Sequence, residues 1–113
     1  MKILLSSAVL VLLFGVIKAD IERGLTSHFS TWLKANGYGN HGFERADLVG
    51  GAYGGKESDA DTVSHDPIVF FHGNSDVGVG TVDDFTGFTK SIEHFISKGY
   101  KKSELYITTW GPG

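Results

Sequence analysis

The first helical pattern in the chain lies after residue 20. Its apolar positions recur at i, i+4, i+7 and i+8, one face of an α-helix, and are Leu25, Phe29, Trp32 and Leu33. Thr26 or Ser27 can cap the start of such a helix, and Gly37 suits a left-handed stop at its end. The pattern predicts a helix of about ten residues whose apolar stripe packs against a core.

A second helical pattern follows Thr81. Its apolar positions share one helical face and are Val82, Phe85, Phe88, Ile92, Phe95 and Ile96. Thr81 and Asp84 have capping-box spacing, Asp83 adds charge at the same end, and Gly99 is a natural stop. Gly87 inside the pattern costs about 1 kcal/mol relative to alanine, so a start one turn later is the alternative.

Two apolar runs flank this second helix. Ile68 to Phe71 follows Pro67 and contains no polar residue, which predicts a strand buried on both faces. Ser103 to Trp110 is rich in β-branched and aromatic residues and predicts another strand. A helix between two strands allows parallel pairing. The fold class is therefore α/β: a parallel strand–helix–strand unit preceded by a helix and a glycine-rich loop.

Glycine and acidic residues dominate residues 36–66. Seven of the chain's 16 glycines lie between Asn36 and Lys56, which predicts a compact loop laid over the core. A phosphate loop is the weaker alternative, because Lys56 is followed by Glu57 and not by serine or threonine. His65 and His72 lie seven apart without further ligands in register, so we predict no metal site and no cofactor.

The amino-terminal segment has the pattern of a secretory signal. Lys2 precedes a nearly unbroken apolar run from Ile3 to Ile17, which is too short for a bilayer span. We predict a signal peptide over residues 1–19, cleaved near Ala19, and a secreted domain over residues 20–113. The chain has no cysteine, so a core alone must hold it. Its net charge of −3 and the lack of a basic run predict no nucleic-acid partner.

The candidate chemistry lies after the apolar run. In α/β sheets ligands bind beyond the carboxyl ends of strands, and here that end carries His72, Gly73 and Asn74. One interpretation makes the Asn74 backbone N–H an oxyanion-hole donor, with Gly73 giving room for a substrate and His72 as a structural support. The other is a plain strand-to-helix turn with a hydrogen-bonded histidine.

Three segments together resemble the class 2 lipases, particularly their secreted nematode branch: residues 68–76, 89–100 and 104–111. Residues 36–39 and 54–56 also resemble the amino-terminal region of those proteins. The resemblance implies an α/β-hydrolase fold and, for complete members, hydrolysis of lipid esters by a Ser-Asp-His triad. It places Asn74 at the position whose amide lines the oxyanion hole.

The family's nucleophile lies in a Gly-x-Ser-x-Gly elbow on a later strand, and this sequence does not contain that motif. The nearest string, Gly73 to Val77 around Ser75, lacks the last glycine. The histidines also lie at positions unsuited to the triad base: His28, His41, His65, His72 and His94. We therefore predict no catalytic residue in this chain and no triad-dependent esterase activity from it alone.

Two functional predictions remain open. The first is the amino-terminal part of a truncated secreted lipase or carboxylesterase, with a lipid ester as the substrate of the complete protein. The second is a secreted non-catalytic module of the same fold that binds lipid or a protein partner. Open sheet edges also predict self-association, because unpaired strand edges are templates for another chain.

Overall fold

The computed structural model describes residues 21–82 and 85–111, so the predicted signal peptide lies outside the described residues. The helices are α2 (Ser27–Ala35), α3 (Thr89–Ser97) and the 3-10 turns η1 (Gly39–His41) and η2 (Lys102–Glu104). The strands are β1 (Gly24–Leu25), β2 (Ala52–Gly54), β3 (Ile68–Val69), β4 (Val79–Val82), β5 (Phe85–Gly87) and β6 (Leu105–Thr108). These elements form a small mixed α/β structure, so the predicted class is confirmed at that level.

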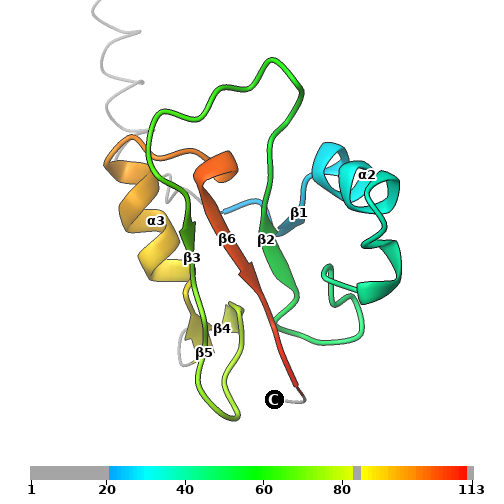
Figure 1. Cartoon of the computed structure of the whole chain (residues 1–113). Coiled ribbons are helices and arrows are strands. Elements are labelled where there is room, and N and C mark those ends of the chain that lie inside the picture. Colours follow the sequence, from blue (N-terminus) through cyan, green and yellow to red (C-terminus); the bar gives the residue numbers. More distant parts are fainter. Residues whose placement is uncertain (1–20, 83–84, 112–113) are drawn as a thin grey trace, which may run out of the picture.

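One sheet organises the molecule. Its strand order is β1–β2–β6–β3, and β4 pairs with β5 in a separate antiparallel hairpin. β3 and β6 are parallel, with Ile68 opposite Leu105 and Val69 opposite Tyr106, which confirms the predicted strand–helix–strand pairing. β2 is parallel to β1 and antiparallel to β6. Figure 1 shows the sheet between α3 on one side and α2 on the other.

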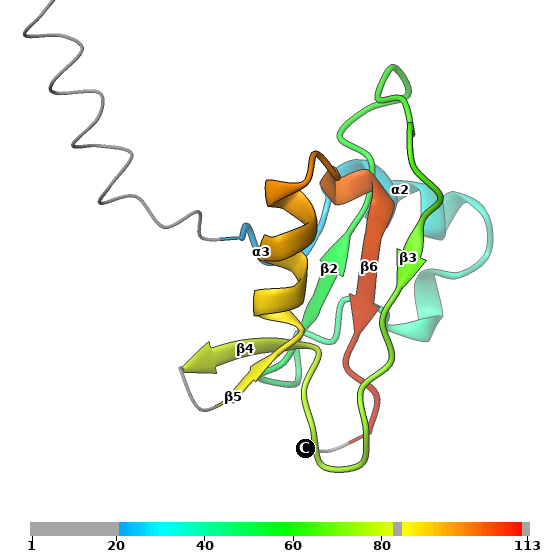
Figure 2. The same cartoon turned by 90° about the vertical axis from the view of Figure 1, so that its left-hand side faces the viewer.

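α3 lies against one side of the sheet, which we call the covered face (Figure 2). A buried cluster forms there from Tyr53, Val79, Ile92, Leu105 and Ile107. The ring of Phe70 packs beside it, 4.9 Å from the ring of Phe88 and 6.0 Å from that of Phe95. Burying each large apolar side chain contributes about 1.5–3 kcal/mol, so this cluster is the main source of stability.

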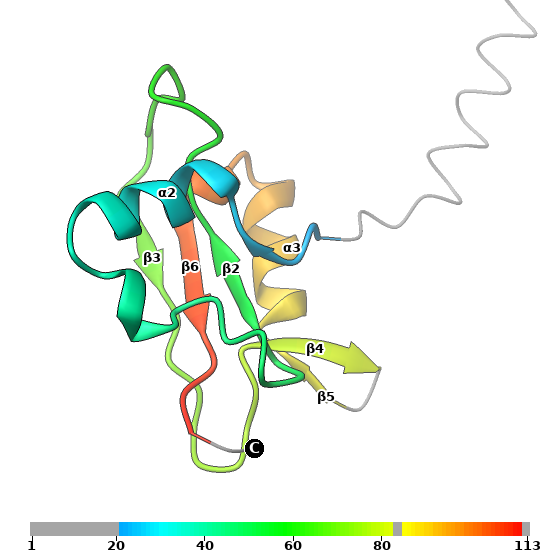
Figure 3. The ribbon, with the colours of Figure 1, turned by 90° about the vertical axis from the view of Figure 1, so that its right-hand side faces the viewer.

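The opposite side, which we call the open face, is crossed by α2 near one end of the strands (Figure 3). Successive side chains of a strand point to opposite faces. In β6, Leu105 and Ile107 are buried on the covered face, whereas Tyr106 and Thr108 are half-buried on the open face. The open face therefore lacks the second layer that α3 provides on the other side.

The first predicted helix is confirmed. Its cap is Thr26, whose Oγ1 accepts a hydrogen bond from the Phe29 N–H at 3.1 Å, and Gly37 follows with a φ of 87°. The stripe packs less completely than predicted, because Leu33 is buried but Trp32 is 48 % exposed. α2 overhangs the open face and does not seal it.

The prediction that Ile68 to Phe71 is a strand buried on both faces is wrong. β3 comprises Ile68 and Val69 and is an edge strand, with 56 % of Val69 and 78 % of Phe71 exposed. Ile68 and Phe70 pack against the core. An unbroken apolar run predicts double burial only when both faces of the sheet are covered.

The predicted helix start at Thr81 is also wrong, since α3 begins at Thr89. Val82 and Phe85 belong to the β4–β5 hairpin, and Asp83 and Asp84 lie outside the described residues. Gly87 has a φ of 51°, and a Cβ there would lie 2.6 Å from the carbonyl oxygen of Gly78. The helical pattern of apolar residues in the sequence thus continues across Gly87, although the chain makes a turn there that only glycine permits. The predicted stop at Gly99, with φ 94°, is confirmed.

The glycine-rich segment contains more regular structure than the sequence predicted. β2 lies within it, fully buried and second in the sheet, and η1 also falls inside it. The segment is therefore part of the core and not only a loop above it. Three residues, one of them glycine, are too few to show a strand period.

Glu104 is a buried carboxylate that fixes the loop before β3. It accepts hydrogen bonds from the backbone N–H groups of Ser64, His65 and Lys101 at 2.7, 2.6 and 2.8 Å, and from the His65 ring at 3.1 Å. Burial alone raises the pKa of Glu104, but these donors outweigh it and lower the pKa to about 2.

Candidate functional site

The loop with the candidate chemistry lies where two strands end. Because β3 and β6 are parallel, their carboxyl ends share one edge of the sheet. The chain after β3 and the chain after β6 run side by side at that edge (Figure 2). The structure therefore brings His72, at the start of the loop that carries Gly73 and Asn74, together with Trp110.

His72 is buried and holds this arrangement through both ring nitrogens. Its Nε2 accepts the backbone N–H of Trp110 at 2.9 Å, and its Nδ1 lies 2.8 Å from the Gly73 carbonyl oxygen. Because Nε2 is an acceptor, the proton of the neutral ring must lie on Nδ1, which donates to Gly73. His72 thus clamps two backbone segments together.

Trp110 completes the clamp from the other side. Its indole Nε1–H donates to the His72 carbonyl oxygen at 2.9 Å, and the two rings stack with centroids 5.0 Å apart. The backbone N–H, the indole N–H and the ring face of Trp110 all contact His72. This tie joins the end of β6 to the start of the loop that carries Asn74.

A second tie holds the far end of the same loop. Thr109 is buried, and its Oγ1 accepts the Gly78 N–H at 2.9 Å. A Cβ at Gly78 would lie 2.8 Å from that oxygen, so glycine permits this close approach. The loop between His72 and Gly78 is consequently anchored at both ends to residues that follow β6.

Between the anchors the chain makes a tight turn. The Asp76 N–H donates to the Gly73 carbonyl at 3.3 Å, and Ser75 has a φ of 60°, unusual for a residue with a side chain. Within the described chain, the Asn74 N–H donates no hydrogen bond. A Cβ at Gly73 would meet nothing within 4 Å, so the space beside it is open. The oxyanion-donor role of Asn74 and the substrate-space role of Gly73 remain predictions.

No base serves Ser75 in this turn. Both ring nitrogens of His72, three residues away, are occupied by backbone groups. Elsewhere, His28 Nε2 lies 2.8 Å from Asp59, and His65 binds Glu104. A serine hydroxyl needs an adjacent base to become a nucleophile. Among the described residues, neither ring nitrogen of His72 is therefore free to act as a base for Ser75.

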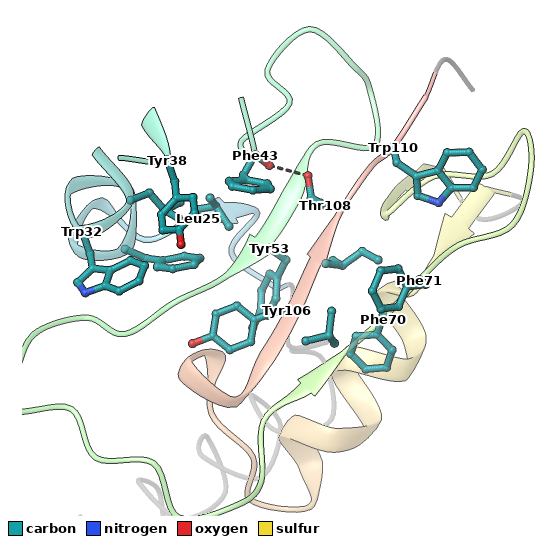
Figure 4. Close-up of a pocket in the computed structure, with 14 residues that line it drawn as sticks. Leu25, Trp32, Tyr38, Phe43, Tyr53, Phe70, Phe71, Tyr106, Thr108 and Trp110 are labelled. Atoms are coloured by element: carbon teal, nitrogen blue, oxygen red, sulfur yellow. Dashed lines mark hydrogen bonds between the residues drawn. The ribbon is translucent and has the colours of Figure 1, made fainter. Parts of the chain in front are cut away.

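An apolar hollow of about 660 Å³ lies on the open face, between α2 and β3 (Figure 4). Large apolar side chains that line it are more than a third exposed: Trp32, Tyr38, Phe43, Val69, Phe71 and Trp110. Trp110 links the hollow to the His72 clamp, so the two features are adjacent. Such a concentration of exposed apolar residues marks an interaction site.

Two hydroxyl groups around the hollow already form hydrogen bonds within the chain. Thr108 Oγ1 donates to the Phe43 carbonyl oxygen at 2.6 Å (Figure 4), and the Tyr106 hydroxyl donates to Ser103 at 2.7 Å. Burial, followed by the negative charges of Asp61 and Glu104, raises the pKa of Tyr106, so the phenol stays neutral. The lining is therefore mainly apolar, and its further polar groups are the hydroxyls of Tyr38 and Tyr53 and the indole N–H of Trp32.

The candidate loop, α3 and β6 fall in one continuous segment that is similar to a known protein family. Residues 65–113 match the family model for class 2 lipases. The match contains all three segments on which the resemblance to class 2 lipases was based, so the resemblance is confirmed there. The similarity of residues 36–39 and 54–56 to class 2 lipases lies outside the match and stays a prediction. No curated protein and no solved structure matches the chain.

Two features are absent from residues 21–82 and 85–111. No cluster of histidine, aspartate and glutamate there could hold a metal ion. Within the same residues, no helix has the length and apolar character needed to cross a bilayer.

The sequence prediction missed Thr109 and Trp110. The signal was present, because two parallel strands joined by a helix must end at the same edge, and the residues after β6 must then meet those after β3. It also missed Glu104, for which one glutamate at a strand start gives no usable pattern.

Proposed function

We propose that this chain is the amino-terminal part of a secreted class 2 lipase or carboxylesterase with an α/β-hydrolase fold. The Asn74 backbone N–H is one donor of its oxyanion hole. The observation that carries this proposal is the position of the His72–Gly78 loop. It lies inside the lipase-matched segment and at the shared carboxyl edge of two parallel strands.

The chemistry explains why the loop is anchored. Attack on an ester carbonyl moves negative charge onto its oxygen, and one fixed N–H donor stabilises that charge by about 2.7–4 kcal/mol. A donor acts in this way only if it is held in place before the substrate arrives. The ties from Trp110 to His72 and from Thr109 to Gly78 supply that rigidity on either side of Asn74.

The nucleophile comes from outside these residues. No Gly-x-Ser-x-Gly occurs in the 113-residue sequence, and the ring nitrogens of His72 are occupied. The chain therefore contributes half of an oxyanion hole and no catalytic triad. In the complete protein a lipid ester is the substrate, and a later segment provides serine, acid and base.

Expression of the full sequence in secreting cells tests this proposal. We expect mature protein in the medium that begins at Asp20, and no hydrolysis of p-nitrophenyl butyrate above the rate of buffer. The Ser75→Ala variant should be indistinguishable from the parent in this assay. Ester turnover that Ser75→Ala abolishes would overturn the assignment, and an unprocessed intracellular product would overturn secretion.

A second candidate function is a secreted, non-catalytic lipid-binding module of the same fold. The apolar hollow favours it, because lipid binding requires an apolar surface and no nucleophile. β3 as an edge strand further supports self-association. Sequencing the transcript beyond the Gly113 codon separates the candidates. An in-frame Gly-x-Ser-x-Gly supports the lipase, and a stop codon with abundant protein supports the module.

A further inference from the structure

The hollow on the open face has the size and shape of a small-molecule site. Its volume of about 660 Å³ falls within the range of about 300–1,000 Å³ that such sites occupy. α2 forms one wall, β3 and Phe71 form the other, and β6 lies between them (Figure 4). The site is concave, so a flat partner would bridge it and leave apolar side chains without contacts.

The lining determines what can fill this space. The hydroxyls of Thr108 and Tyr106 and the indole N–H of Trp110 are each bonded to a backbone carbonyl. The other polar groups of the lining are the hydroxyls of Tyr38 and Tyr53 and the indole N–H of Trp32. They are too few to satisfy the backbone of a peptide, which would leave buried groups without partners. A hydrocarbon tail has no such groups.

One end of the hollow carries charge. A smaller recess of about 280 Å³ adjoins it and shares Phe29, Trp32 and Tyr106 with its lining. The recess also contains Lys56 and a His28–Asp59 pair 2.8 Å apart. Among the described residues Lys56 makes no ion pair, so a positive charge is available where the apolar surface ends.

We propose that the hollow binds the single hydrocarbon tail of a fatty-acid anion, with its carboxylate at Lys56. This inference rests on the second candidate function, the lipid-binding module, and names its ligand class and its site. Binding here needs neither Asn74 nor a nucleophile. Its outcome is therefore separate from that of the ester-hydrolysis assay.

Intrinsic fluorescence provides a direct measurement. The chain has two tryptophans, Trp32 and Trp110, and both line the hollow. Oleate, added as monomers to protein expressed from the full sequence, should change tryptophan emission saturably. Oleyl alcohol, which has the same tail without the charge, should bind more weakly, by about two- to fivefold, the range of an exposed ion pair.

Matched variants locate the ligand. Val69→Asp places a carboxylate in the hollow and should weaken oleate binding about tenfold or more. Val63→Asp changes another exposed valine outside the hollow and should leave binding within twofold. Lys56→Met should remove the preference for oleate over oleyl alcohol, whereas Lys98→Met should retain it. Circular dichroism checks that each variant is folded.

Several results would overturn the proposal. One is oleate binding that Val69→Asp and Val63→Asp weaken equally. Another is equal affinity for oleate and oleyl alcohol in the parent protein. Flotation with phosphatidylcholine vesicles without saturable oleate binding would exclude this site while leaving a lipid-binding function standing. A dimer in sedimentation that Val69→Asp dissociates, with no response to oleate, would assign the hollow to a second copy.

Discussion

The two faces of the sheet have nearly opposite surroundings although the same strands build both. On the covered face, Ile92 and Leu105 are fully buried. On the open face, Phe71 is 78 % exposed and Val69 56 % exposed. Leu105 and Val69, which lie in the paired strands β6 and β3, thus differ strongly in burial. What separates them is α3, which covers one face along the strands, whereas α2 overhangs one end of the other (Figures 2 and 3).

Polarity does not explain this difference. The buried set on or beside the covered face includes Glu104, Ser103 and Thr109, while aromatic side chains remain exposed on the open face. Buried polar groups are tolerated when hydrogen bonds satisfy them, as the five donors to Glu104 do. Among the described residues the hydroxyl of Ser103 is an exception, because it is buried without a hydrogen-bond partner. Apolar groups are buried only where another layer exists to cover them. The open face is therefore a surface adapted to contact something else, which agrees with both proposed functions.

The largest test of this comparison is a pair of truncations. Ile92→Ala should destabilise the protein by about 2–5 kcal/mol, because it removes a fully buried side chain and leaves a cavity. Phe71→Ala on the open face should change the unfolding free energy by about 0.5 kcal/mol or less. Urea denaturation followed by circular dichroism measures both.

The proposed difference between the two faces would be contradicted if Phe71→Ala lowered the free energy of unfolding nearly as much as Ile92→Ala. It would mean that the open face is covered in solution by a second molecule. Repeating the measurement over a range of protein concentrations identifies that case, since stability then depends on concentration.

Two adjacent threonines give a finer test. Thr109→Val leaves the Gly78 N–H without its acceptor in a buried position, which should cost about 1–3 kcal/mol. Thr108→Val removes a hydroxyl that bonds the Phe43 carbonyl on the open face and should cost about 0.5 kcal/mol or less.

Thr109→Ser is the matched control, because it keeps the oxygen that accepts the Gly78 N–H. Amide exchange at Gly78 should quicken in Thr109→Val and stay slow in Thr109→Ser. Equal exchange in the two variants would show that Thr109 does not anchor the candidate loop.

The sequence predicted elements well where a local signal was sufficient. The Thr26 cap and the Gly37 stop bracket α2, and the helix between two strands gave the parallel pairing. The loop position of Asn74 followed from strand polarity alone. These features depend on residues close in the chain or on a general rule of sheet topology.

Predictions failed where burial or pairing depended on distant residues. The run from Ile68 to Phe71 does not reveal that its strand lies at an edge. The helical period before Thr89 continues through Gly87, although backbone contact with Gly78 requires a turn there. The His72 clamp depends on Trp110, 38 positions later, and becomes visible only once the register is known.

The smallest predicted effect on the free energy of unfolding near neutral pH comes from the ionisation of Glu104. Its pKa of about 2 in the folded protein lies below its ordinary value of 4.5. The stability it contributes is therefore complete above about pH 4.5 and is lost as pH falls toward about 2. The Lys101 hydrogen bond that lowers the pKa of Asp61 adds a loss of the same sign.

A comparison of the parent with Glu104→Gln isolates the first term, because Asp61 is common to both. The gap in unfolding free energy should be constant from pH 7 to about pH 5 and shrink below about pH 4.5. A gap that stays the same down to about pH 2 would show that the pKa of Glu104 is the same in the folded and the unfolded protein. The hydrogen bonds to Glu104 would then not stabilise its ionised form.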